Sequence, residues 1–259
     1  MIFLPNQLFK KAASFKRYGQ LFSNWWTACF ARYLAKIFPN RKPVIVQFRD
    51  GRQLTFRPSS DYVALGEIFI AQNYQKLWPD SCPPLVWDIG GNIGMFVLDA
   101  FSRCPEARYV SFEPCQPTFE LLDMNRRANP SIHWEVHPFG FGRATETRLA
   151  FVPKNHFGET SLFSREGRAF PLALVQLEEF WRKAGRPNVG LLKVDCEGAE
   201  FEIFESLSPE FFRAVKQILV EIHPVSGKAP ESLLSLFRLQ GFRIKNDLAP
   251  LYSASRDRN

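Results

Sequence analysis

The chain has 259 residues, of which 46% are hydrophobic and 23% are charged, and its formal net charge is +7. This composition is typical of a folded globular protein and excludes a disordered or fibrous one. No apolar run reaches the roughly 18 residues that a membrane-spanning helix requires, and the N-terminus lacks the cleavage pattern of a secretory signal.

The five cysteines are an odd set without a C-x-x-C pair. We therefore expect neither a disulfide framework nor a zinc knuckle, and a reducing cytoplasm is the expected setting. Much of the basic excess lies near the two ends of the chain. It indicates a solvated face, with attraction to an anionic substrate or membrane surface as the alternative.

Residues 1–42 are predicted to form a separate helical extension. Large apolar side chains recur there at spacings of three and four: Phe22, Trp25, Trp26, Phe30, Leu34 and Phe38. Such a stripe is expected to pack on the protein's own core. Peripheral contact of residues 21–38 with a membrane, favoured by the two tryptophans and the nearby basic residues, is the alternative.

Residues 43–84 are predicted to form a β-hairpin and a helix that lead into the core. Two alternating runs flank Asp50-Gly51, a dipeptide that favours a tight hairpin turn. The segment 61–78 then has the pattern of one helix, which ends before Pro79.

Residues 85–255 alternate between short apolar strands and helices, which indicates crossover connections and a mostly parallel sheet covered on both faces. Strands are expected at 85–90, 108–114, 132–140, 189–195, 217–223 and 241–244, and helices at 92–104, 116–129, 172–185, 199–208, 209–215 and 231–240. A polar stretch, 153–168, interrupts this rhythm and could cover a site as a lid that carries His156.

The segment VWDIGGNIGMF, residues 86–96, follows the first of these strands. Ligands of such sheets bind beyond the carboxyl ends of the strands, where the strand order reverses. Gly90 and Gly94 permit unusual backbone angles and close approach of a ligand. Asn92 tolerates left-handed geometry and can cap the next helix. Asp88 places a carboxylate directly before this loop.

Three interpretations of the loop remain open. The glycines could serve a tight turn alone. A nicotinamide or flavin dinucleotide would need the G-x-G-x-x-G register, which is absent, and Asp88 would repel its diphosphate. S-adenosylmethionine has no phosphate and carries an ammonium and a sulfonium, so a carboxylate that meets this positive charge favours it. Glu113, at the end of the second strand, can accept hydrogen bonds from a ribose diol, although a merely exposed Glu113 is the alternative.

The chain resembles the FkbM family of S-adenosylmethionine-dependent methyltransferases over about residues 44–246. The resemblance rests on VWDIGGNIGMF, YVSFEP, GETSLF, VQLEEF, LLKVDCEGAEFEIFESL and ILVEIHP, in this order, and on EIFIAQNYQKLW before them. Gly91 and Cys196 depart from the usual alanine and valine or isoleucine.

The resemblance implies a class I, Rossmann-like α/β fold with a seven-stranded, mostly parallel sheet. It also implies methyl transfer to a hydroxyl group of a saccharide, natural product or other small molecule. The residues expected to hold the cofactor are Asp88, Gly90, Asn92, Gly94, Glu113 and Tyr74.

An alcohol acceptor needs a base, or a bound cation, to remove its proton. The strand ends in LLKVDCEG and ILVEIHP are expected to meet near the cofactor loop, and we expect Asp195, Glu197 and His223 to lie at the acceptor, with His223 as a neutral base. A divalent metal on Asp195, Glu221 and His223 is an alternative that no local spacing requires. Glu200 and Glu202 are expected on an exposed helix face.

No nucleic-acid acceptor is expected, because the chain lacks an N-P-P-Y or D-P-P-Y string and does not interleave basic and aromatic residues along the catalytic strands. The competing hypothesis from another class is a non-catalytic nucleotide-binding protein on the same fold, whose N-terminal extension would recruit a membrane or a partner.

Overall fold

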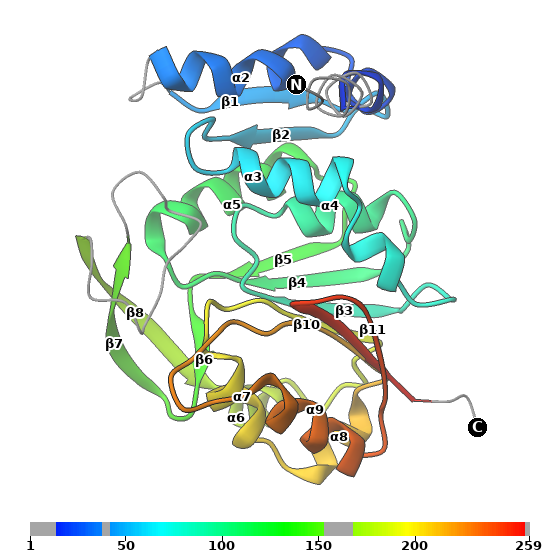
Figure 1. Ribbon diagram of the computed structural model, residues 1–259, viewed down its shortest axis with the longest axis vertical. Helices are drawn as coiled ribbons and strands as arrows, with labels where there is room; N and C mark the ends of the chain where they lie inside the picture. Colours follow the sequence, from blue (N-terminus) through cyan, green and yellow to red (C-terminus); the bar gives the residue numbers. More distant parts are fainter. Residues whose placement is uncertain (1–13, 38–41, 153–167, 257–259) are drawn as a thin grey trace, which may run out of the picture.

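The computed structural model describes residues 14–37, 42–152 and 168–256. A seven-stranded sheet lies at its centre, with the order β11-β12-β10-β9-β3-β4-β5 (Figure 1). The strands are β3 Leu85–Ile89, β4 Arg108–Phe112, β5 Trp134–His137, β9 Leu191–Val194, β10 Gln217–Glu221, β11 Arg243–Leu248 and β12 Leu251–Ser255. β12 pairs antiparallel with both β10 and β11, and the other neighbouring strands of this sheet pair in parallel. The predicted α/β fold with a mostly parallel sheet is thus confirmed.

Helices cover both faces of the sheet (Figure 1). One face carries α3 Tyr62–Leu65, α4 Met95–Phe101 and α5 Gln116–Ala128, and the other carries α6 Leu177–Lys183, α7 Glu200–Glu205, α8 Pro209–Ala214 and α9 Pro230–Leu239. Successive side chains of a strand point to opposite faces. Val86 accordingly belongs to the apolar cluster on the α4 side, and Trp87 belongs to the cluster on the α7 side.

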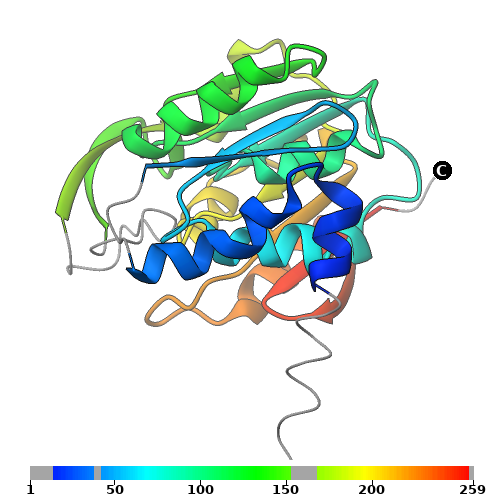
Figure 2. The same ribbon diagram turned by 90° about the horizontal axis from the view of Figure 1, so that it is seen from above.

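The predicted hairpin is present. β1 Val44–Gln47 pairs antiparallel with β2 Gln53–Phe56, and Gly51 adopts a φ of 92° in the turn between them. The helix α2 Trp25–Ile37 lies over this hairpin as the outermost layer (Figures 1 and 2). Phe22 is fully buried in the same apolar cluster as β1, β2 and α4. The described part of the N-terminal extension therefore packs on the core of the sheet domain.

The prediction of a single helix over 61–78 is wrong. α3 passes into a π-helix, η1 Gly66–Ile70, and a separate 3-10 helix follows, η2 Tyr74–Leu77. Between them Gln72 has a φ of 55°, which a continuing helix does not allow. The break turns Tyr74 inward, where its hydroxyl reaches the end of β9.

A second sheet was not anticipated. It contains β6 Gly140–Gly142, β7 Glu146–Val152 and β8 Arg168–Gln176, in the order β6-β8-β7. The helix expected over 172–185 begins only with α6, because residues 172–176 pair with β6 and β7. Leu172 and Leu174 are buried, whereas Ala173 between them is exposed. This alternation of buried and exposed residues is typical of a strand and differs from the helical pattern predicted for the segment.

Cys82 and Cys104 form a disulfide, contrary to the expectation of none. The fold explains the pairing, because the loop before β3 crosses the turn after α4 and brings these two distant positions together. In the described ranges, no helix has both the length and the apolar character needed to cross a membrane.

Candidate functional site

The reversal of strand order places two loops side by side. The chain leaves β3 towards β4, while β9 pairs with the opposite edge of β3. The loops after β3 and β9 are joined by a hydrogen bond from the Asp195 amide to the Ile89 carbonyl, at 3.1 Å. Gly90 has a φ of +75°, and a Cβ atom there would lie 1.8 Å from the Asp195 carbonyl oxygen. Only glycine fits this contact.

The rest of the glycine loop is shaped by its neighbours on β4 and β5. Gly94 has a φ of +88° at the start of α4, and a Cβ atom there would lie 2.2 Å from the Trp134 ring. Asn92 adopts a φ of 48°, and its amide donates a 3.0 Å hydrogen bond to Glu113 Oε2. The Asn92 Oδ1 atom is buried and accepts no hydrogen bond from the described residues.

Glu113 follows β4 and is 7% exposed, so it is not the surface residue of the alternative interpretation. Its Oε1 atom accepts a 2.9 Å hydrogen bond from the Cys115 amide, and its Oε2 atom accepts the bond from Asn92. Burial raises the pKa of Glu113 to about 7, against the opposing effect of these two bonds. The carboxylate is fixed in place by two amides while each oxygen keeps capacity for a further donor.

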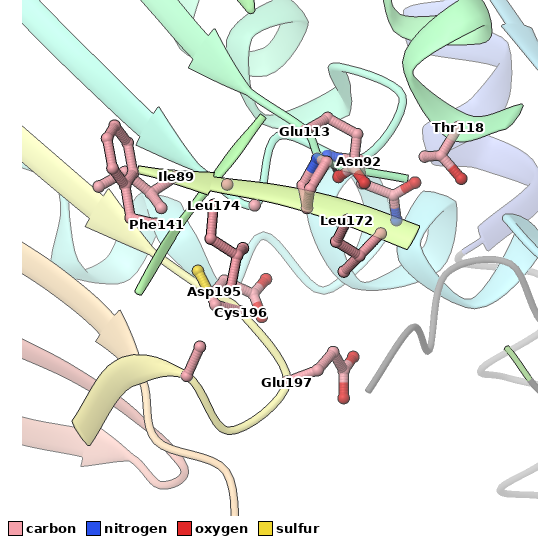
Figure 3. Close-up of a pocket in the computed structure, with 14 residues that line it drawn as sticks. Ile89, Asn92, Glu113, Thr118, Phe141, Leu172, Leu174, Asp195, Cys196 and Glu197 are labelled. Carbon is pink, nitrogen blue, oxygen red and sulfur yellow. Dashed lines mark hydrogen bonds between the residues drawn. The ribbon is translucent and has the colours of Figure 1, made fainter. Parts of the chain in front are cut away.

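A cavity of about 100 Å³ opens beside Glu113 (Figure 3). It is lined by Ile89, Gly90, Asn92, Glu113, Pro114, Thr118, Gly140, Phe141, Leu172, Leu174, Asp195, Cys196, Glu197 and Ala199. Phe141 and the two leucines of β8 form its apolar side, and Asn92 and Glu113 its polar side (Figure 3). The second sheet therefore supplies a wall that the sequence did not predict. An apolar wall with a few fixed polar groups is the usual lining of a small-molecule site.

Asp88 is fully buried and lies outside the lining of this cavity. Its Oδ1 atom is 3.1 Å from Lys193 Nζ, and its Oδ2 atom accepts a 3.1 Å hydrogen bond from the Ser111 hydroxyl. A positive charge does meet Asp88, as its position suggested, but the protein supplies it from the neighbouring strand. Asp88 thus holds Lys193 beneath the loop.

Lys193 links the two loops from below. Its ammonium donates a 2.7 Å hydrogen bond to the Gly90 carbonyl and lies 3.5 Å from Asp195 Oδ2. Burial alone would lower the pKa of Lys193, but the charges of Asp88 and Asp195 outweigh it and raise that pKa. Tyr74, from the broken helical segment, donates a 3.0 Å hydrogen bond to the same Asp195 oxygen. The Asp195 carboxylate is therefore held from two sides.

A second cavity, of about 280 Å³, lies on the other side of Asp195. Its lining comprises Ala64, Glu67, Ile68, Asn73, Tyr74, Gly90, Gly91, Asn92, Ile93, Met95, Phe96, Lys193, Asp195, Glu221, Ala249, Pro250 and Leu251. Gly90, Asn92 and Asp195 line both cavities, so the two meet at the glycine loop.

Two carboxylic acids, Glu67 and Glu221, face this second cavity. Burial, reinforced by the charge of Asp195, raises the pKa of Glu221 to about 7, and the same two effects raise the pKa of Glu67. An acid with a pKa near neutrality can both accept and release a proton under physiological conditions. The sequence predicted that Glu221 lies at the converging strand ends, as a candidate metal ligand, but it did not indicate a role in proton transfer.

His223 lies behind Asp195 and lines neither cavity. Its Nδ1 atom is 2.9 Å from Glu200 Oε1, and its Nε2 atom is 3.9 Å from Asp195 Oδ1 and 3.7 Å from Glu197 Oε2. Burial lowers the pKa of His223, but the hydrogen bond and charge of Glu200, with the charges of Asp195 and Glu197, raise it to about 9. This raised pKa favours the protonated ring at physiological pH, whereas the sequence predicted a neutral base.

Glu200 is fully buried, contrary to the prediction of an exposed helix face. Its Oε1 atom also accepts a 2.8 Å hydrogen bond from the Cys196 amide. Glu202, in contrast, is half-buried and pairs with Arg148 at 2.7 Å. Glu200 thus ties His223 to the loop 195–198, in which Glu197 has a φ of 52°.

The described part of the chain contains no group of three or more His, Cys, Asp or Glu side chains placed to hold a metal ion. Asp195, Glu221 and His223, the alternative metal site, are not brought together as such a group in the described residues. His156 and most of the expected lid, 153–167, lie outside the described residues.

Comparisons with known proteins agree with this geometry. The family described as methyltransferase FkbM domain matches residues 88–244, which is more than half of the chain. The chain is 27% identical over 228 residues to methyltransferase sdnD of Sordaria araneosa, covering 73% of this chain and 88% of that protein. It is 24% identical over 220 residues to the 31-O-demethyl-FK506 methyltransferase FkbM of Streptomyces tacrolimicus, covering 73% and 84%.

A crystal structure of methyltransferase FkbM from Methylobacillus flagellatus KT is similar in fold, with a TM-score of 0.50 and 12% sequence identity. That likeness covers 96% of this chain and 60% of the other. The matched range includes the glycine loop, the end of β4 and the end of β9, which frame the two cavities. The chain belongs to the FkbM family of S-adenosylmethionine-dependent methyltransferases.

Proposed function

We propose that this protein transfers a methyl group from S-adenosylmethionine to a hydroxyl group of a small molecule, a saccharide or a natural product. The observation that carries the proposal is the pair of cavities that meet at Gly90, Asn92 and Asp195. A transfer reaction needs two sites that share one boundary, so that donor and acceptor atoms can meet. The relative from Streptomyces tacrolimicus is named for a methylation at oxygen, which supports an oxygen acceptor.

The first cavity fits the nucleoside part of the cofactor. Glu113 is held by two amides with its oxygens directed at the cavity, where they would accept the ribose hydroxyl protons. Asn92 Oδ1 is a buried acceptor that lacks a protein donor among the described residues, which a polar group of the ligand would supply. Phe141 and Leu174 would pack on the adenine. When bound, the cofactor supplies a methyl group on a cationic sulfur.

The residues at the shared boundary would position this methyl group. Gly90 lets its loop lie directly against the Asp195 carbonyl, where the Cβ atom of any other residue would collide. Asp195, held by Tyr74 and by Lys193, presents a fixed carboxylate to both cavities. Tyr74 and Lys193 act here as positioning residues, because they orient Asp195 from below and from the side. Asp88 acts one step further away by pairing with Lys193.

We assign removal of the acceptor proton to Glu221. It lines the acceptor cavity, and burial raises its pKa to about 7, which matches a general base at neutral pH. His223, with a pKa of about 9, is protonated there and cannot accept that proton. Its cationic ring instead neutralises Asp195 and Glu197 and fixes the loop that carries them.

A methyl-transfer assay tests the proposal. Protein with isotope-labelled S-adenosylmethionine is incubated with pools of hydroxylated saccharides and natural products, and label is sought in products that survive mild alkali, as ethers do. For an active acceptor, we expect Glu221→Gln to lower kcat by about 10²-fold or more, the usual contribution of a general base, with cofactor affinity unchanged.

The matched control is Glu67→Gln, which neutralises another carboxyl group of the same cavity. We expect this variant to retain most of kcat. Equal losses in both variants would remove the assignment of Glu221 as the base. Cofactor binding without label in any acceptor pool would favour the non-catalytic alternative.

A further inference from the structure

The outer face of α2 carries large aromatic side chains that the described residues leave exposed. Trp26, Phe30 and Tyr33 are 53%, 56% and 63% exposed, and their spacing of four and three places them on one face of the helix. The face turned to the core instead carries Ala28 and Ala31, which are buried. Folding normally buries the largest apolar side chains. Trp25 and Cys29 of the same helix also pack, partly buried, against the core, so Trp26, Phe30 and Tyr33 form a separate exposed face among the described side chains.

The charge of the chain is concentrated in the same region. Residues 1–42 contain eight Lys and Arg residues and no Asp or Glu, whereas the rest of the chain has 25 basic and 26 acidic residues. The net charge of +7 thus comes entirely from the segment that carries the aromatic face. Among the described residues of this segment, the side chains of Lys16 and Lys42 are exposed.

We propose that the face of α2 formed by Trp26, Phe30 and Tyr33 docks the protein on an anionic lipid bilayer. Tryptophan and tyrosine favour the boundary between headgroups and acyl chains, where an apolar ring and a polar edge are both accommodated. A basic segment beside an apolar helix face is the combination that draws a helix onto an anionic surface without crossing it. The position of α2 as the outermost layer leaves this face accessible (Figures 1 and 2).

A nucleic acid fits these observations less well. Single strands bind where basic residues line a groove and aromatic rings stack successive bases. The aromatic side chains here project from the convex outer face of one helix, and none of them lines a described cavity. Docking on lipid is independent of the reaction proposed above, since no residue of either cavity belongs to α2.

The docking proposal is tested by co-sedimentation of the full chain with vesicles. We expect binding to equimolar phosphatidylglycerol and phosphatidylcholine, little binding to phosphatidylcholine alone, and weakening in about 0.5 M sodium chloride. A Trp26→Ser, Phe30→Ser, Tyr33→Ser variant should lose about tenfold or more in vesicle affinity, because the apolar contribution is removed. Its circular dichroism and cofactor affinity should be unchanged, since the three side chains are exposed. Phe30→Asp alone should show the same direction of change.

The matched control removes three exposed apolar side chains elsewhere, as Val63→Ser, Met124→Ser, Leu239→Ser. It should bind vesicles as the unmodified chain does. The proposal is overturned by equal affinity for neutral and anionic vesicles, by no vesicle binding, or by full vesicle affinity in the α2 variant. It is also overturned if an RNA oligonucleotide competes with the vesicles and the α2 variant loses binding to that RNA. A third contrary result is a chain that forms a dimer, does not bind vesicles, and becomes a monomer in the α2 variant.

Discussion

At the scale of single residues, one buried ammonium group connects the charges of the site. Lys193 lies 3.1 Å from Asp88 and 3.5 Å from Asp195, and it donates a hydrogen bond to the Gly90 carbonyl. A buried charge is tolerated only when it is paired and hydrogen-bonded. The carboxylate before the glycine loop is therefore explained by a cation within the fold, which also anchors the loop on which a ligand would rest.

The carboxylates around His223 raise its pKa to about 9. Because Glu200 accepts its Nδ1–H, we expect Glu200→Gln to lower the pKa of His223 from about 9 towards the ordinary 6.5. Nuclear magnetic resonance of the ring carbon-bound protons measures this, and the chain has only four histidines to assign. A His223 pKa that does not move in the glutamine variant would contradict the role given to Glu200.

The same group makes a stability contribution of known sign. A pKa raised on folding adds stability that is fully present below pH 6.5 and is lost as the pH rises to about 9. The shift corresponds to about 3 kcal/mol at most. Urea unfolding of the unmodified chain and of His223→Gln at pH 6 and pH 9 isolates this contribution, with the exposed His133→Gln as control.

At the scale of elements, the end of β3 touches the end of β9 through a backbone contact that admits no side chain. We expect Gly90→Ala to abolish cofactor binding and to lower the free energy of unfolding by well over the roughly 1–2 kcal/mol that left-handed geometry alone costs alanine. A Cβ atom at Gly90 would overlap the Asp195 carbonyl at 1.8 Å, so one of the two loops must shift. Calorimetry and urea unfolding measure the two effects.

Gly185 provides the control for this substitution. It has a comparable φ of +85°, but a Cβ atom there would meet no other atom within 4 Å. Gly185→Ala should therefore lower the free energy of unfolding only by the cost of left-handed backbone geometry for alanine. It should leave cofactor binding intact. Equal effects of the two substitutions would mean that close approach of the loops is unimportant.

Several elements could be predicted because their signals are local. Asp50-Gly51 between alternating runs predicts β1 and β2, and the strand that ends in Asp88 predicts the glycine loop. The second sheet was not predicted for two reasons. β8 pairs with β7 across a long connection, and the sequence of residues 172–176 is also compatible with a helix. The break before Tyr74 was not predicted because tertiary contact with Asp195 outweighs helix propensity.

The same distinction holds for the site. Glu113 and Asp195 were identified because strand ends converge at one edge of a parallel sheet, which the alternating pattern reveals. The charge state of His223 could not be predicted, because it depends on Glu200. Glu200 is the buried first residue of α7, just after the loop 195–198. The role assigned to Glu221 likewise follows from burial and from the charge of Asp195, which only the folded arrangement supplies.

At the scale of the whole molecule, the sheet order divides the protein into two regions of different chemistry. The carboxyl ends of β3, β4, β9 and β10 supply residues that frame two adjoining cavities. The N-terminal layer carries the aromatic face and the net positive charge. The family match spans the first region and stops short of the second, so the catalytic fold and the docking face are tested by separate experiments.

The central claim is that the cavity beside Glu113 binds the nucleoside of the cofactor, and calorimetric titration with S-adenosylhomocysteine tests it most directly. We expect saturable binding at pH 8 and weaker binding at pH 6, because burial holds the pKa of Glu113 at about 7. We expect Glu113→Gln to lose about tenfold or more in affinity. No heat at millimolar ligand, or equal affinity in the glutamine variant, would contradict it.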